Sequence, residues 1–197
     1  SESNQEFQDL AMEISPRLAK FGNDVSLNKA LFERVKYVHD NHLASLNEED
    51  ARLTENSYKG FVRNGAMLNN EEKDKLRSID EELSTLSPKF SNNALNATNA
   101  FEMWLDEDDL SGLPKIAIEA AKAAAKAKGN EEKWLITLQM PSYLPFMKYS
   151  TNRELREKLS VASATKCNGD EYDNSGLVNK IAKLKHQRVQ LLGYDNY

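Results

Sequence analysis

The residues nearest to a metal-binding arrangement are His39 and His42, in the segment His39-Asp40-Asn41-His42. A zinc peptidase of the His-Glu-x-x-His class needs two imidazoles four residues apart on a helix, with a glutamate after the first to activate the metal-bound water. Here the spacing is three, and an aspartate follows the first histidine. His42 also lies four residues after Val38, at the edge of an apolar stripe. We therefore interpret both histidines as boundary residues with ordinary partners, and a metal site as the alternative.

Other segments with chemical potential give weaker signals. Cys167 has no histidine nearby in the sequence, and Lys166 alone is a poor reason to expect an activated thiolate. The acidic run 106–109 lacks the spaced ligands and closing glutamate of a calcium loop, so we expect a solvated turn. The sequence contains no glycine-rich phosphate loop. It therefore predicts no catalytic residue, no cofactor-binding residue and no metal ligand among these 197 residues.

The composition limits the class of protein. Hydrophobic residues make up 40% and charged residues 29%, with 8 Gly and 5 Pro, which indicates a folded, helix-rich chain. The net charge is -5 without a cluster of basic residues and aromatics, which argues against a nucleic-acid partner. No apolar run approaches the roughly 20 residues that cross a bilayer, so we expect no membrane partner. We predict a cytoplasmic location, with the periplasm as the alternative; Cys167 alone forms no internal disulfide.

Apolar residues recur every three or four positions along most of the chain, which is the pattern of helices with one buried face. The stripe of the first helix consists of Phe7, Leu10, Ile14 and Leu18. We expect this helix to end near Gly22 and Ser26 to be the N-cap of a second one. Asn47, followed by three acids, predicts the start of a third helix that runs to about Arg63.

A fourth helix is the longest that the pattern predicts. Asn69 and Glu72 have the spacing of a capping box, which places the start of the helix there. The apolar rhythm then continues to Ala97, so a helix from about residue 70 to about residue 98 would be roughly 40 Å long. Pro88 should bend this helix without ending it, because it removes one backbone donor and its ring crowds the preceding turn.

The remaining segments predict one strand pair and three further helices. Residues 101–106 and the apolar run 134–140 are expected to pair as short strands. Between them, a turn at residues 111–114 leads into an Ala-rich helix that ends near Gly129. Two final helices are expected at about 151–167 and 175–192. The fold class is therefore all-α, mostly helical, with one long kinked helix and at most a short two-stranded β pair, in a single domain over residues 1–197.

Four groups of segments, in chain order, resemble the thimet oligopeptidase family of zinc metallopeptidases, of the oligopeptidase A and dipeptidyl carboxypeptidase type. The most specific group is WLITL at 134–138, PSYLPFM at 141–147 and NRELREKL at 152–159. The others are FVRNGA at 61–66 with LSTLS at 83–87, DLSGLP at 109–114, and EYDN at 171–174 with LLGY at 191–194. Together they span most of the chain.

The resemblance implies a role without chemistry of its own. In this family two histidines of His-Glu-x-x-His and a later glutamate hold zinc, and the glutamate of the motif is the general base. None of these positions occurs here, so no catalytic residue is carried over. The chain would be the N-terminal, non-catalytic part, forming a wall of a deep channel that admits short peptides. Zinc would belong to the full-length enzyme, and the implied partners are peptide substrates and the missing C-terminal catalytic domain.

The resemblance also predicts that the chain is a fragment. It begins at Ser1 without an initiator Met and stops soon after Gly193, and we expect it to be inactive alone and to self-associate through uncovered apolar surface. One alternative is a free-standing helical module that binds a partner protein in a groove between helices. A weaker alternative is a small metal-binding helical protein that uses His39 and His42. Endopeptidase and dipeptidyl carboxypeptidase activity are not distinguished by these residues.

Overall fold

The structure is a computed structural model that describes residues 4–197. Within that range the chain divides into two compact units, which are described separately. The helical unit comprises residues 4–89 and 177–197, and the central unit comprises residues 90–176. The division falls inside one long helix and near the start of the last helix. That the whole chain forms a single domain stays a prediction.

The chain is mostly helical, as the sequence predicts. The α-helices of the described residues are α1 Gln5–Ser26, α2 Lys29–His42, α3 Glu48–Arg63, α4 Asn70–Ala100, α5 Lys115–Ala127, α6 Met140–Tyr149, α7 Arg153–Thr165 and α8 Ser175–Leu191. Short 3-10 turns occur at Leu43–Ser45 and Glu107–Leu110. The strands are β1 Met103–Leu105 and β2 Trp134–Ile136. The predicted fold class, all-α with one short strand pair, is confirmed.

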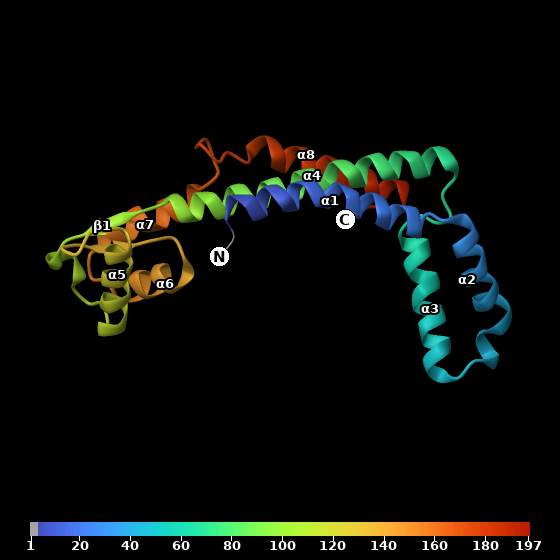
Figure 1. The fold of residues 1–197 in the computed structure, drawn as a ribbon, viewed down its shortest axis with the longest axis horizontal. Coiled ribbons are helices and arrows are strands. Elements are labelled where there is room, and N and C mark those ends of the chain that lie inside the picture. The colour runs from blue at the N-terminus through green and yellow to red at the C-terminus, as the bar shows by residue number, and fades with distance from the viewer. Residues whose placement is uncertain (1–3) are drawn as a thin grey trace. The chain divides into compact units, whose positions relative to one another are not determined.

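In the helical unit, α2 and α3 run side by side as a hairpin (Figure 1). Asn28 caps α2 by accepting a hydrogen bond from the backbone N–H of Leu31 at 3.0 Å, and Asn47 caps α3 through the N–H of Asp50 at 2.9 Å. The two helices contact each other through aromatic side chains. The ring centroid of Phe32 on α2 lies 5.9 Å from that of Phe61 on α3. The cap at Asn47 is as predicted.

The boundary between α1 and α2 differs from the prediction. Helix α1 continues through Gly22 to Ser26, and the N-cap of α2 is Asn28. The Ser26 hydroxyl instead donates to the carbonyl of Gly22, at 2.5 Å, so it bonds within α1. A glycine inside a helix costs only about 1 kcal/mol relative to Ala, which the other contacts of a 22-residue helix outweigh.

The apolar stripe of α1 was expected to be buried, and this expectation is wrong for the structure. Phe7 is 65% exposed, Leu18 is 63% exposed, and Leu10 and Ile14 are also exposed. Periodicity predicts that a face will be covered, but it does not say by which part of a protein.

Helix α4 extends over 31 residues and passes through Pro88 without interruption. The capping box that predicted its start is present: Asn69 Oδ1 accepts from the N–H of Glu72 at 2.9 Å, and Glu72 Oε2 accepts from the N–H of Asn69 at 3.0 Å. The predicted continuation through Pro88 is therefore confirmed, while the bend there stays a prediction.

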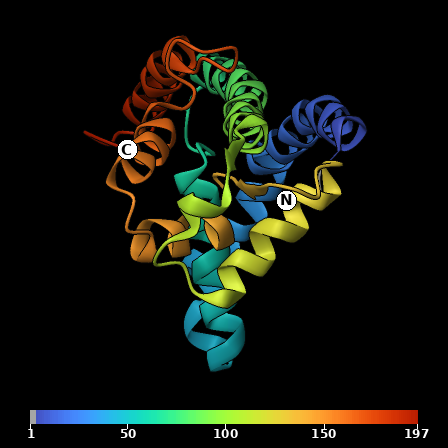
Figure 2. The same cartoon turned by 90° about the vertical axis from the view of Figure 1, so that its left-hand side faces the viewer.

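In the central unit, β1 and β2 form an antiparallel pair with Trp104 opposite Leu135. Helix α5 contacts β2 and α6, and α6 in turn contacts α7; Figure 2 views this part from another side. The core of the unit consists of Met103, Leu105, Leu113, Ala121, Ile136, Leu138, Phe146 and Leu159. The strand pair was predicted because a lone strand would leave its backbone groups without partners.

The run 134–140 was expected to be a strand throughout, but the strand ends at Ile136 and helix α6 follows at Met140. The Ser142 hydroxyl accepts from the N–H of Thr137 at 3.0 Å, which turns the chain into α6. Pro141 lies in the first turn of α6, where its missing N–H would have no intrahelical partner anyway. The prolines at 141 and 145 concealed this helix from the sequence pattern.

Candidate functional site

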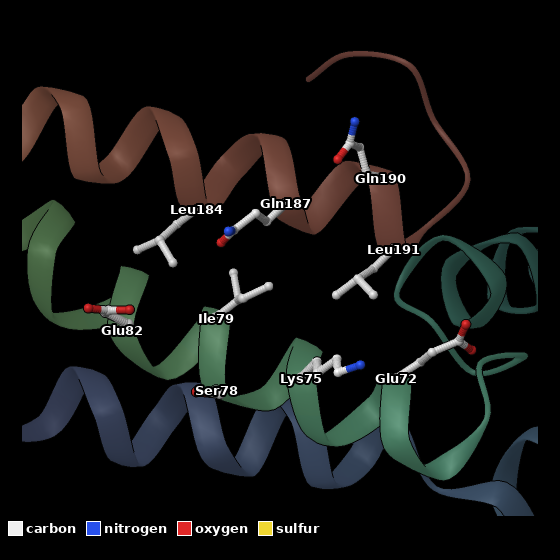
Figure 3. Close-up of a pocket in the computed structure, with 9 residues that line it drawn as sticks. All are labelled: Glu72, Lys75, Ser78, Ile79, Glu82, Leu184, Gln187, Gln190 and Leu191. Atoms are coloured by element: carbon white, nitrogen blue, oxygen red, sulfur yellow. The ribbon is translucent and has the colours of Figure 1, made fainter.

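A groove lies between α4 and α8, within the helical unit (Figure 3). It has a volume of about 660 Å³. The residues that line it are Glu72, Lys75, Ser78, Ile79 and Glu82 from α4, and Leu184, Gln187, Gln190 and Leu191 from α8. No helix among residues 4–197 is long and apolar enough to span a membrane.

Two ion pairs fix α8 beside α4. Arg188 Nε lies 2.7 Å from Asp80 Oδ1, and these side chains are only 22% and 17% exposed. Lys180 pairs with Glu82 nearer the start of α8. Both pairs join residues about a hundred positions apart in the sequence, so they orient the two walls of the groove relative to each other. The Asp80–Arg188 pair is the better shielded from solvent screening of the two.

The groove has an apolar floor and a polar rim. Figure 3 shows Ile79 of α4 facing α8, with Leu184 and Leu191 directed back toward α4. Figure 3 shows the amide of Gln187 directed into the groove, whereas the amide of Gln190 points away from α4. A carboxamide both donates and accepts hydrogen bonds, as a peptide backbone does. The groove thus offers the contacts that an extended peptide segment would use.

The charges at the rim are set by neighbours on the same helix. Lys75 Nζ lies 2.8 Å from Glu71 Oε1, one turn earlier on α4. The hydrogen bond from Lys75 holds the pKa of Glu71 below its ordinary value, and the same bond raises the pKa of Lys75. Both groups are therefore charged at neutral pH and form an ion pair at the rim.

Few side chains of the groove lining are suited to nucleophilic catalysis. Ser78 is the hydroxyl side chain of its lining, and no lining residue is a histidine or cysteine. A nucleophilic serine needs a general base within hydrogen-bond reach. Among residues 4–197, no three or more His, Cys, Asp and Glu side chains come together in a way that could hold a metal ion.

The two histidines that the sequence singled out have separate aromatic partners. His39 stacks on Tyr58 of α3, with ring centroids 4.1 Å apart and an interplanar angle of 14°. Its Nδ1 lies 2.8 Å from Asp40 Oδ1. His42 lies against Tyr37 instead, with ring centroids 5.3 Å apart. His39 is thus held by stacking and a hydrogen bond, and His42 by a tilted ring contact, so the two imidazoles have different partners.

Asp40 shows how completely this end of α2 is paired. Its carboxylate accepts from Lys36 and lies beside His39, and both interactions keep the pKa of Asp40 below its ordinary value. The bond to Lys36 is the larger cause. Neighbours on its own helix therefore account for this carboxylate.

Cys167 is a thiol without activation. Burial raises its pKa, and the charge of Asp170 adds to the effect, so the thiol form is favoured at neutral pH. The acidic run 106–109 falls in a short 3-10 turn, where Asp109 Oδ2 accepts from the N–H of Asp106 at 3.1 Å. Both observations agree with the interpretation of the sequence, which found an ordinary thiol and a solvated turn.

The sequence did not predict the groove between α4 and α8. Its signal was present in part, since Leu184, Gln187 and Leu191 occur at helical spacing on one face of α8. That α8 lies beside α4 depends on pairs such as Asp80 with Arg188, which no local pattern reveals.

Comparison with known proteins gives a consistent result. No family model matches the chain. It is 35% identical over 193 residues to the organellar oligopeptidase A of Arabidopsis thaliana, which covers 94% of this chain and 24% of the relative. It is 34% identical to oligopeptidase A of Salmonella typhimurium and to dipeptidyl carboxypeptidase of the same organism, over 99% of this chain and 30% and 29% of those relatives.

This chain is homologous to the N-terminal part of oligopeptidase A. The resemblance that the sequence segments indicated is thereby confirmed. The chain spans about a quarter to a third of the length of the curated relatives it matches.

Proposed function

We propose that this chain is the N-terminal helical part of a zinc-dependent oligopeptidase, and that it forms a wall of the channel through which short peptides reach a catalytic domain. The zinc ligands and the general base would come from polypeptide beyond these 197 residues. The chain by itself would then bind no zinc and cleave no peptide. A cytoplasmic location stays a prediction.

The observation that carries the proposal is the similarity over 94–99% of this chain to proteins named as oligopeptidases and a dipeptidyl carboxypeptidase. The chain has no His-Glu-x-x-His motif, so the chemistry of such an enzyme would have to lie elsewhere. The relatives are three to four times as long as the matched part, which leaves ample polypeptide for a catalytic domain.

The α4–α8 groove supports the part of the proposal that concerns a channel wall. Its apolar floor would take side chains of a peptide, and the amide of Gln187 would pair with peptide backbone groups. Helix α4, with 31 residues, supplies a long continuous surface.

The test is hydrolysis of a quenched fluorescent oligopeptide by this chain and by the product of the full reading frame, each with and without a zinc chelator. We expect cleavage by the longer product alone, abolished by the chelator. Cleavage by neither product, or a reading frame that ends at Tyr197, would remove the peptidase role and favour a helical interaction module.

A variant tests whether Gln187 contacts the substrate or has only a structural role. In the longer product, Gln187→Ala should raise KM about 2- to 10-fold with kcat unchanged, because one neutral hydrogen bond contributes about 0.5–1.5 kcal/mol. The matched control is Gln5→Ala on α1, whose amide donates to Asp9 on its own helix and is absent from the groove lining. Equal KM values for the two variants would show that Gln187 does not contact substrate.

A further inference from the structure

The exposed face of α1 is the most unusual surface of the helical unit. Six large apolar side chains lie along it, and their exposed fractions range from 37% to 67%. They are Phe7, Leu10, Ile14, Leu18, Phe21 and Val25. Contiguous apolar surface of this extent usually marks an interface. We call these six residues the α1 stripe.

The opposite face of α1 is the one that is covered, and apart from the half-buried Met12 its residues are small or polar. Gln8 is 7% exposed and Asn23 is 9% exposed. Ser15 and Ala19 are half-buried on the same side. Asp24 pairs with Arg77 of α4 at 2.6 Å, and Figure 3 shows α1 running along α4. The helix therefore uses its polar side within the unit and leaves its apolar side outward, the reverse of an ordinary surface helix.

The geometry of the stripe fits another helix. Successive members are separated by 3, 4, 4, 3 and 4 residues, which averages 3.6 and keeps the stripe straight along α1. From Phe7 to Val25 it extends about 27 Å at 1.5 Å per residue. Ridges of this kind interlock with the side-chain rows of a second helix.

The length of the relatives indicates where that second helix would come from. The chain covers only 24–30% of the relatives it matches over almost its whole length. A protein of that size would have most of its polypeptide outside these residues. An apolar stripe of this kind needs a permanent partner, because a freely exposed one promotes aggregation. A partner within the same polypeptide is present at a fixed ratio and high effective concentration.

We propose that the α1 stripe is an internal docking face, covered in the full-length protein by a helix from the polypeptide outside residues 1–197. The inference rests on the proposed function to the extent that it requires a longer reading frame. It assigns α1 the task of joining the N-terminal part to the rest of the enzyme, separately from the α4–α8 groove.

Thiol labelling tests the proposal. With Cys167 replaced by Ser, a single cysteine is introduced as Leu18→Cys or Val25→Cys on the stripe, or as Lys20→Cys on the exposed charged side of α1 as control. A maleimide dye is then added to the 197-residue chain and to the full reading-frame product. Val25→Cys changes the side-chain volume little, which protects the test against misfolding of Leu18→Cys.

We expect all three thiols to react rapidly in the 197-residue chain. In the longer product the two stripe thiols should react at least about tenfold more slowly, because labelling would require local opening, while the Lys20→Cys thiol stays fast. Rapid labelling of the stripe in a longer product that still cleaves peptide would overturn this proposal and leave the proposed function standing.

Two further outcomes would also overturn the proposed docking face. Slow labelling of the stripe already in the 197-residue chain would overturn the proposal, and dependence of that rate on protein concentration would identify a second copy as the occupant. A reading frame that ends at Tyr197 would overturn both this inference and the proposed function.

Discussion

Arg188 of α8 donates a hydrogen bond from Nε to Asp80 Oδ1 of α4 at 2.7 Å, across 108 positions of sequence. Both side chains are mostly shielded from solvent, so removing one leaves the other charge without its partner in a poorly hydrated place. We predict that Arg188→Ala lowers the free energy of unfolding of the helical unit by about 1–3 kcal/mol. Urea unfolding followed by the helical circular dichroism signal measures this.

The control for Arg188→Ala is Arg17→Ala. Arg17 pairs with Glu13 one turn away at 2.7 Å, but its side chain is 73% exposed, so its loss should cost at most about 0.5 kcal/mol. A double-mutant cycle with Asp80→Ala isolates the pair itself. Equal effects of the two arginine substitutions would contradict a special role for the Asp80–Arg188 pair.

The capping box at the start of α4 makes a second prediction. Asn69→Ala removes the acceptor for the N–H of Glu72 and should destabilise the helical unit by about 1 kcal/mol. Asn70→Ala is the matched control, because Asn70 is the first residue inside the helix and does not carry this cap. The difference in urea midpoint between the two variants is the measurement, and no difference would mean that the cap is dispensable.

These cases show what could be predicted from the sequence. The capping box of Asn69 and Glu72 is local, so four residues of sequence contain all of it. The pairing of α4 with α8 is non-local, and the groove it creates therefore could not be predicted. Helix α6 was not predicted because it contains Pro141 and Pro145, although proline is tolerated in a first helical turn.

Helix α1 illustrates a different limit. Its period of 3.6 residues correctly predicted a helix, and the amphipathic pattern correctly indicated which side is apolar. Burial of Phe7 or Leu18 depends on what lies opposite, and a helical pattern contains no information on the partner. The wrong expectation of a buried stripe is thus also the observation from which the docking face is inferred.

Gly112 supports a third prediction, on the central unit. Its φ of +86° is unfavourable for any side chain, and an added Cβ would lie 2.3 Å from the carbonyl oxygen of Tyr149. Gly129 has a similar φ of +83°, but a Cβ added there would meet open space. Gly129→Ala should therefore cost about 1–2 kcal/mol of backbone strain, and Gly112→Ala about 1–3 kcal/mol more.

The tryptophans allow this difference to be measured selectively. Trp104 and Trp134 both lie in the central unit, so their fluorescence follows its unfolding in urea. Gly112→Ala should move that transition to lower urea than Gly129→Ala does. Equal urea midpoints for the two variants would show that the backbone near Tyr149 shifts to accommodate the added methyl group without loss of stability.

Asp173, in the turn before α8, predicts a dependence of stability on acid pH. The backbone N–H of Gly169 donates to its Oδ1 at 3.0 Å and the Ser175 hydroxyl at 2.7 Å. These bonds, the first being the larger cause, hold the pKa of Asp173 below its ordinary value of 3.8. The unfolded chain therefore takes up the proton first as the pH falls, and the stability that the carboxylate contributes is present above about pH 4 and is lost below it.

Asp173→Asn removes this titration while keeping the shape of the side chain. We expect the variant to be less stable than the parent at pH 7, because an amide oxygen accepts hydrogen bonds more weakly than a carboxylate. The difference in free energy of unfolding should stay constant down to about pH 5 and shrink as the pH falls through the depressed pKa of Asp173. Urea unfolding of both proteins at pH 7, 5 and 3 gives the three differences, and a difference that grows toward pH 3 would contradict the assigned direction of the pKa shift.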